Sequence, residues 1–325
     1  MLLFLRRSFI AYWKGKGVYL KQNVSLGQTF LAILVIFVFI AITSLSVLLG
    51  AVILPLVVYY LLKIKHKSNY HFWLIFISFM FPALLFLSPL LWIWVVVLYI
   101  LTAVIHHTLA KGFSQELTLF YGTFTLMLSV VGGLNMLVFM GVINPLSETF
   151  STFRSWYMEQ IENMGGLNVG FVDAEMFSAA LTQMFAQLPA YITVISFFVI
   201  LYTVLMLRLL LQNKELPAWS YMSFSEWAFP RFILYLFFIL YIVSLFTTTE
   251  DTFGTIISNS YVLVEWAVFL HGLSFSYFFL LEKKVNKVLS VIILIPLAII
   301  RPLTLVIGLL EMVFRFRLLM KLKRK

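Results

Sequence analysis

Residues 24–62 read VSLGQTFLAILVIFVFIAITSLSVLLGAVILPLVVYYLL, an apolar run without a charged side chain. A helix that crosses a bilayer needs about 20 apolar residues, so this run is too long for one span and fits two. Small and polar residues gather at residues 44–50, where we expect the turn between the two spans. Residues 63–67 read KIKHK and end the second span.

The rest of the chain has the same character. Hydrophobic residues make up 62% of its 325 residues, charged residues only 11%, and the mean hydropathy is +1.03. This composition is typical of a polytopic membrane protein, whose backbone polar groups must be paired inside the bilayer. We therefore expect an all-α transmembrane helix bundle of about eight spans followed by a C-terminal helical hairpin.

Five segments are expected in order. Residues 1–23 are basic and aromatic, and form either an amphipathic segment on the cytoplasmic surface or a disordered basic tail. Residues 24–143 hold spans one to five, and residues 188–281 hold spans six to eight. Between them, residues 144–187 form an extracytoplasmic loop. Residues 282–325 form an apolar hairpin with a basic cytoplasmic tail.

The loop at residues 144–187 contains two amphipathic pieces. In the first, large apolar residues recur at helical spacing over residues 150–164, before Gly165-Gly166. In the second, Asp173 is placed to cap the N-terminus of a helix. As a hypothesis, this loop acts as a lid over a cavity that opens outward between spans five and eight.

The C-terminal segment is interrupted by Pro296 and by Arg301-Pro302. A single ninth span would carry the basic residues of the tail to the outside. We therefore expect two short spans, or a re-entrant hairpin, that turn near Arg301-Pro302 and return inside. Non-helical backbone at that depth must be shielded by protein.

The charges give the orientation. With the N-terminus inside, every lysine-rich loop falls inside and the acidic loop falls outside, as the positive-inside rule requires. The formal net charge of +10 is therefore interpreted as contact with anionic lipid headgroups at the cytoplasmic face, and a nucleic acid partner is not expected. Both termini are expected to be cytoplasmic.

Ionisable groups inside a membrane are candidates for function because their burial is costly. Glu265 and His271 lie within the eighth span, and helical spacing puts Glu265, Gly272 and Ser276 on one face. Glu265 is interpreted either as a ligand contact or as a structural group, which pairs with a buried arginine or reaches the outer interface.

The fifth span offers a second polar face. Ser129 and Asn135 lie near Gly132 and Gly133 in this span. Small and hydroxyl residues let helices pack closely and bond across the contact, and they also line substrate paths. Together with Glu265, His271 and Ser276, the residues Ser129 and Asn135 complete the candidate ligand site.

The sequence lacks the motifs of several common catalytic and metal-binding sites. The chain has no cysteine, which excludes disulfides and thiolate ligands. The adjacent pair His106-His107 does not share a helix face, so it is a weak metal site. There is no phosphate-binding loop and no Gly-x-Ser-x-Gly elbow. We expect no enzyme activity, no metal and no cofactor.

Three short motifs carry a resemblance. They are Ser225-Glu-Trp-Ala-Phe-Pro230, His271-Gly-Leu-Ser274, and the stretch from Gly308 to Arg317 that contains Glu311. With them, the chain from about residue 24 resembles the YybS-like family of bacterial membrane proteins of unknown function. That family usually has Asp at the position of Glu311. The resemblance implies the bacterial plasma membrane as the location.

The same family is distantly similar to MreD-like envelope proteins and to the S components of energy-coupling-factor transporters. An S component binds its substrate from outside and relies on a separate ATPase and a coupling protein. Two features of this chain depart from that pattern. The first span lacks an Ala-x-x-x-Ala motif, and the C-terminal hairpin exceeds the usual six helices.

Two functions from different classes follow. The first is S-component-like binding or uptake of a small molecule, with an ATPase module as partner. The second is a non-transporting scaffold that binds cell-envelope or signalling proteins in the membrane. Under the first, Glu265→Ala is expected to abolish ligand-induced thermal stabilisation without loss of expression, and an unchanged response removes Glu265 from the site.

Overall fold

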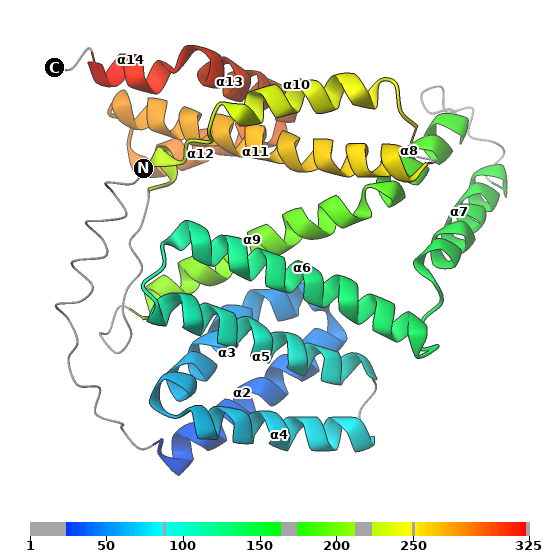
Figure 1. Cartoon of the computed structure of the whole chain (residues 1–325), viewed down its shortest axis with the longest axis vertical. Coiled ribbons are helices and arrows are strands. Elements are labelled where there is room, and N and C mark those ends of the chain that lie inside the picture. Colours follow the sequence, from blue (N-terminus) through cyan, green and yellow to red (C-terminus); the bar gives the residue numbers. More distant parts are fainter. Residues whose placement is uncertain (1–23, 87–88, 164–173, 212–222, 249–250, 323–325) are drawn as a thin grey trace. The chain divides into compact units, whose positions relative to one another are not determined.

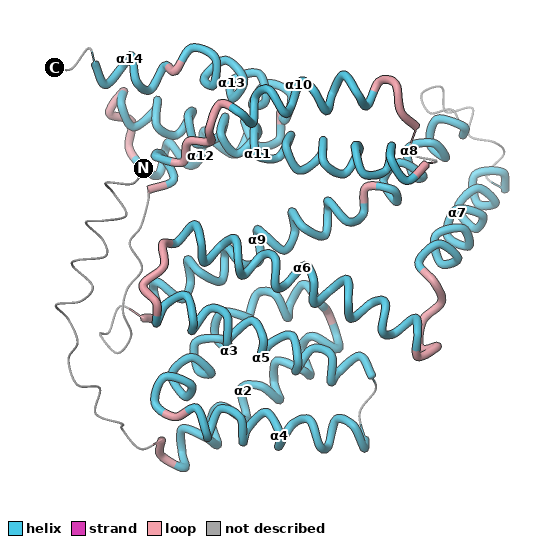
Figure 2. Tube along the Cα trace, viewed as in Figure 1, coloured by secondary structure: helices cyan, strands magenta, loops and turns pink. Residues whose placement is uncertain are grey.

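The computed structural model describes residues 24–86, 89–163, 174–211, 223–248 and 251–322. These residues form thirteen α-helices and one short 3-10 helix, with no strand among them (Figures 1 and 2). The predicted all-α class is therefore confirmed. The predicted amphipathic segment at residues 1–23 lies outside the described residues.

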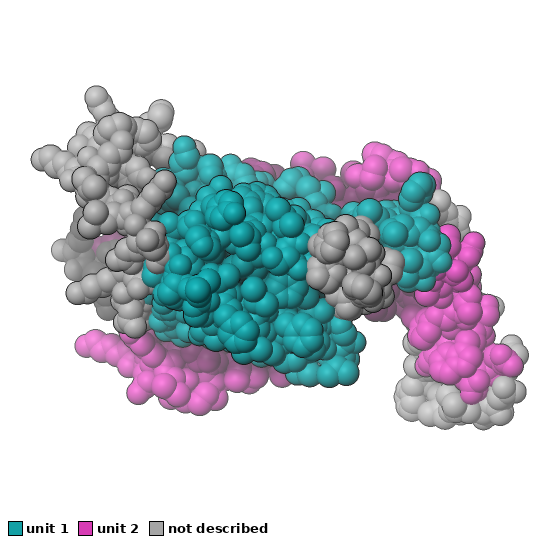
Figure 3. Space-filling view, turned by 90° about the horizontal axis from the view of Figure 1, so that it is seen from below, with its two compact units in different colours: residues 1–143, 196–221 teal, residues 144–195, 222–325 magenta. Residues whose placement is uncertain are grey.

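The chain divides into two compact units, which Figure 3 colours separately. Unit 1 contains residues 1–143 and 196–221, and unit 2 contains residues 144–195 and 222–325.

Unit 1 is built from neighbouring helices that follow one another in the sequence. They are α2 (Leu26–Leu45), α3 (Val47–Lys67), α4 (Asn69–Phe86), α5 (Pro89–Ala110) and α6 (Gln115–Phe139), joined by the second half of α9 (Leu188–Leu210). Consecutive members of the α2–α6 series pack on one another, and α5 also contacts α2 and α3. Short connections favour such antiparallel neighbours.

The turn expected at residues 44–50 falls at Ser46. Its backbone N–H donates to the Ile42 carbonyl at 2.9 Å, and its hydroxyl accepts from the Leu49 N–H at 3.5 Å. One serine therefore ends α2 and begins α3. Gly50 faces the Thr43 side chain so closely that a Cβ there would overlap it. The two helices pair tightly because position 50 has no side chain.

Unit 2 is arranged around one long helix. Its elements are α7 (Leu146–Asn163), α8 (Ala174–Ala186), the first half of α9, the 3-10 helix η1 (Phe224–Glu226), α10 (Phe232–Ser244), α11 (Thr252–Glu282), α12 (Lys287–Ile299), α13 (Arg301–Phe314) and α14 (Phe316–Leu322). Helix α11 contacts α8, η1, α10, α12, α13 and α14. It is therefore the core of the unit, beside α10 and α13 in Figure 1.

By length and composition, six described helices can cross a membrane, or seven spans if the bent pair α12–α13 counts as one. The six are α2, α3, α5, α6, α9 and α11. The two other predicted spans correspond to α4 and α10. Helix α10 has only 13 residues. At 1.5 Å per residue it is about 20 Å long, shorter than a hydrocarbon core of about 30 Å.

The predicted C-terminal turn falls at Ile300, one residue before Arg301. Helices α12 and α13 are bent by 107° relative to each other at this residue. Pro302 suits the first turn of α13, where a missing N–H leaves no bond unmade. The Thr304 hydroxyl donates across the bend to the Leu297 carbonyl and satisfies one acceptor there.

Both amphipathic pieces of the segment at residues 144–187 are helices, α7 and α8, and the rings of Phe150 and Phe185 stack between them with their centroids 4.4 Å apart. Gly165, Gly166 and Asp173 lie outside the described residues. Asn259 of α11 bonds to the backbone on both sides of the break between α8 and α9. Its amide nitrogen donates to the Ala186 carbonyl at 2.7 Å, and its amide oxygen accepts from the Ala190 N–H at 2.9 Å.

Candidate functional site

Unit 2 buries a group of polar side chains that we call the charge cluster: His271 and Ser274 on α11, Glu311 on α13, and Arg317 on α14. All are at most 8% exposed. These four residues belong to two of the three sequence motifs. The third motif, residues 225–230, contacts His271 and Arg317. Three segments distant in sequence therefore meet at one place.

Glu311 is the centre of the charge cluster. Its carboxylate contacts Nε2 of His271 and lies 3.5 Å from Nε of Arg317. A buried carboxylate needs such partners, because an uncompensated charge in a low-dielectric interior is strongly destabilising. The arginine supplies the opposite charge, and the histidine supplies a hydrogen bond.

The tautomer of His271 follows from its two partners. The backbone N–H of Phe229 donates to Nδ1 at 3.2 Å, so Nδ1 is an acceptor. A neutral imidazole then carries its proton on Nε2 and donates to Glu311. His271 therefore connects the non-helical backbone before α10 to the carboxylate on α13.

Arg317 and Ser274 satisfy the carbonyls of the segment that holds η1. Nη1 of Arg317 donates to the carbonyl oxygens of Trp227, at 2.8 Å, and Ser225, at 3.2 Å. The Ser274 hydroxyl lies 2.6 Å from the Phe224 carbonyl and accepts from Nη2 of Arg317 at 3.0 Å. Unpaired backbone groups cost several kcal/mol in lipid, so the charge cluster holds this segment, η1 and the residues after it, against the bundle.

Next to the charge cluster, α11 and α13 cross with their backbones in contact. A Cβ at Gly272 would overlap the Thr304 carbonyl oxygen, and a Cβ at Gly308 would overlap the Val268 carbonyl oxygen. Paired small residues allow this approach between membrane helices. The crossing places Glu311, three residues after Gly308, opposite His271.

Glu265 lies on α11 and pairs with Arg301 at the bend between α12 and α13. Their charged groups are 3.0 Å apart, with side chains 18% and 32% exposed, respectively. The guanidinium carbon of Arg301 also lies 4.7 Å from the ring centroid of Trp266. The sequence left open whether Glu265 contacts a ligand or pairs with an arginine, and the structure provides the arginine.

The other candidate residues fall in separate places. Ser276 is buried on α11, and its hydroxyl donates to the Gly272 carbonyl at 2.9 Å. Ser129 and Asn135 belong to α6 in unit 1, where Asn135 is exposed and its amide donates to the Val131 carbonyl at 2.8 Å. Their role as ligand contacts stays a prediction, as does the cavity between spans five and eight.

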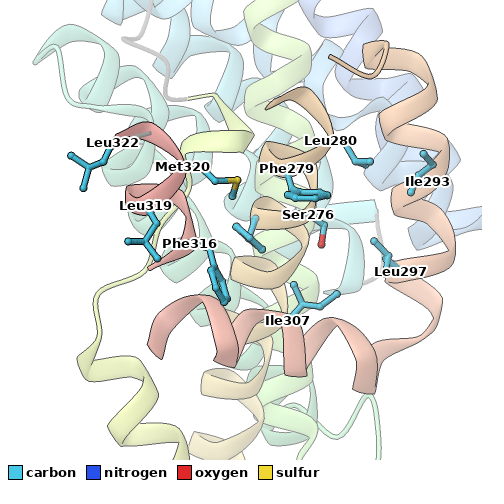
Figure 4. Close-up of a pocket in the computed structure, with 11 residues that line it drawn as sticks. Ser276, Phe279, Leu280, Ile293, Leu297, Ile307, Phe316, Leu319, Met320 and Leu322 are labelled. Atoms are coloured by element: carbon cyan, nitrogen blue, oxygen red, sulfur yellow. The ribbon is translucent and has the colours of Figure 1, made fainter. Parts of the chain in front are cut away.

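A groove of about 920 Å³ opens on unit 2, and we call it the α11–α14 groove. Helices α11, α12, α13 and α14 all contribute side chains to its wall (Figure 4). Ser276 lines it, and the other lining residues are apolar: Phe275, Phe279, Leu280, Ile293, Leu297, Ile307, Phe316, Leu319, Met320 and Leu322. Arg317 lies on the helix that forms one wall, so the charge cluster fixes that wall in place.

The sequence predicts His271 as a site residue but not its partners. Ser274, Glu311 and Arg317 belong to the motifs without being predicted as site residues, and Arg301 is predicted only as part of a turn. The contact between these motifs in the fold shows that their polar residues form one cluster. Within the described residues, no three His, Asp or Glu side chains are grouped so that they could hold a metal ion.

The family described as "Predicted membrane protein (DUF2232)" matches residues 30–313. No curated protein and no solved structure matches the chain. The matched residues cover all three motifs except the end of the last one, and most of both units. This chain belongs to the DUF2232 family of predicted membrane proteins.

Proposed function

We propose that this membrane protein binds a small apolar or amphiphilic molecule in the α11–α14 groove and has no enzyme activity of its own. The groove is the observation that supports this function. Its volume is about 920 Å³. Ligand sites typically measure about 300–1,000 Å³ and are mostly apolar with a few polar groups. Ser276, a candidate from the sequence, supplies the polar group in this wall.

The rigidity of the surrounding helices supports the same proposal. Arg317 fixes α14 through the charge cluster, and Gly272 and Gly308 fix α13 against α11. A site on packed helices holds its shape better than one on loops. We further propose an S-component-like role in the bacterial plasma membrane, with both termini cytoplasmic and a separate ATPase module supplying energy.

Ile293→Trp is expected to reduce ligand binding several-fold, because Ile293 lines the groove and an indole at this position would fill part of it. The probe is a photoactivatable fatty alcohol added to vesicles that contain the full chain. Mass spectrometry of the labelled peptides measures probe attachment to α11–α14.

Ile292→Trp is the matched control. Ile292 is the neighbouring residue, is 54% exposed and does not line the groove. Its labelling is expected to match that of the unmodified chain. Equal labelling of both variants, or no labelling of α11–α14 in the unmodified chain, would count against the groove as a ligand site.

The scaffold function is the second candidate, and the outer helices favour it. Phe153 and Trp156 of α7 are 47% and 54% exposed on a helix that precedes the membrane spans of unit 2. Purification in mild detergent separates the two functions. Co-purified ATPase subunits support the S-component-like function, whereas a cell-envelope or signalling protein supports the scaffold.

A further inference from the structure

Three exposed lysines lie in the turn between α11 and α12, the two helices that contribute Leu280 and Ile293 to the α11–α14 groove. Lys283 and Lys284 follow the end of α11, and Lys287 begins α12. Nζ of Lys283 lies 5.6 Å from the ring centroid of Phe279, which lines the groove. The ammonium group of Lys283 therefore lies within cation–π distance of one residue of the apolar wall.

The lysines have no carboxylate partner among the described residues, since the ion pairs found there involve other cations. Glu282 is close in sequence but already has an interaction of its own. Lys284 adopts a left-handed backbone, with φ of 58°, as the chain turns from α11 into α12. The turn thus carries three cations within five residues, next to the helix ends that follow Leu280 and precede Ile293 of the groove.

We propose that the α11–α14 groove holds one acyl chain of an anionic phospholipid, whose phosphate-bearing headgroup lies on Lys283, Lys284 and Lys287. This inference rests on the proposed function and adds the class of ligand. An apolar trough next to a cationic turn matches a molecule with a long apolar chain and an anionic head. A soluble anion fits the lysines but leaves the apolar wall uncovered.

The headgroup decides the selectivity. Lipid tails are as apolar as leucine side chains, so an acyl chain gains little by moving from the bilayer into the groove. Each lysine near an anionic lipid surface contributes a favourable electrostatic term, which salt weakens. One headgroup carries a single negative charge that the three lysines share, so their contributions do not add fully, and we expect a preference of about tenfold for anionic over zwitterionic phospholipid.

The test uses the full chain in phosphatidylcholine vesicles. A small fraction of the lipid is either photoactivatable phosphatidylglycerol or photoactivatable phosphatidylcholine with the same acyl chains. Labelling of α11–α14 by phosphatidylglycerol is expected to exceed labelling by phosphatidylcholine about tenfold. In Lys283→Gln/Lys284→Gln/Lys287→Gln the two lipids are expected to label almost equally.

The control removes the same charge elsewhere, as Lys63→Gln/Lys67→Gln/Lys111→Gln in unit 1, and is expected to keep the preference. If the triple variant at the groove does not fold, Lys283→Gln alone is expected to lower the preference measurably. Equal labelling of the unmodified chain by both lipids overturns the anionic headgroup but leaves the groove as a chain-binding site. The fatty alcohol probe, which carries no charge, tests the groove independently.

Discussion

Arg317→Met is expected to destabilise the protein by about 3–5 kcal/mol, because it leaves the buried Glu311 carboxylate without its cation. It also removes the donors that satisfy the carbonyls of Ser225 and Trp227. The free energy of unfolding, measured by titration with a denaturing detergent in micelles, checks the size of the loss.

Two further variants separate charge pairing from side-chain loss. Arg315→Met is the matched control, since Arg315 is an exposed arginine two residues away, and its effect is expected to be within about 0.5 kcal/mol. The double variant Glu311→Gln/Arg317→Met removes both charges and keeps an oxygen that accepts from His271. It is expected to be more stable than Arg317→Met alone by about 0.5–3 kcal/mol. The single variant Glu311→Gln completes the cycle, and a loss in the double variant equal to the sum of the two single losses would show that the pair is not coupled.

Local sequence patterns predicted the helices well because each pattern depends on neighbouring residues. The apolar run at residues 24–62 is longer than one span, and its small residues identify the turn at Ser46. Arg301-Pro302 interrupts the last apolar segment, and the bend is found at Ile300. Both features follow from the length of a span and from backbone chemistry, without knowledge of the tertiary contacts.

The length of α10 was harder to predict. The apolar stretch runs from residue 230 to residue 246, but the helix covers only Phe232–Ser244. The segment before it is held in a non-helical form by His271 and Arg317, which are distant in sequence. Pro230 disfavours helical backbone at Phe229, and these tertiary hydrogen bonds fix the non-helical form of the segment.

The site could be predicted only in part for the same reason. Helical spacing places Glu265 and Ser276 on one face of a helix but does not say what that face meets. Their surroundings depend on Arg301 and on α12, which follow later in the chain. The partnership of His271 with Glu311 spans 40 residues, beyond the reach of any periodic pattern. The motifs indicated these residues without indicating that they touch.

Gly308→Ala is expected to destabilise unit 2 by about 1–3 kcal/mol, although alanine is the better helix former. A Cβ at this position would overlap the Val268 carbonyl oxygen, and it would lie 3.1 Å from the backbone nitrogen of Gly272. Backbone atoms of a packed helix cannot move aside as a flexible side chain can. Helices α11 and α13 must therefore separate, which moves Glu311 on α13 away from His271 on α11.

Gly132→Ala makes the same change in α6, where a Cβ would meet nothing within 4 Å. It is expected to leave stability unchanged or raise it by up to about 1 kcal/mol, since alanine restricts the unfolded chain more than glycine does. The free energies of unfolding of both variants, measured in detergent, separate the effect of the helix crossing from that of helix propensity.

The double variant Gly272→Ala/Gly308→Ala is expected to lose less stability than the sum of the losses of its two single variants, because helices that have already separated have room for the second methyl group. Full additivity, or a neutral Gly308→Ala, would mean that the close crossing of α11 and α13 does not determine the position of the charge cluster.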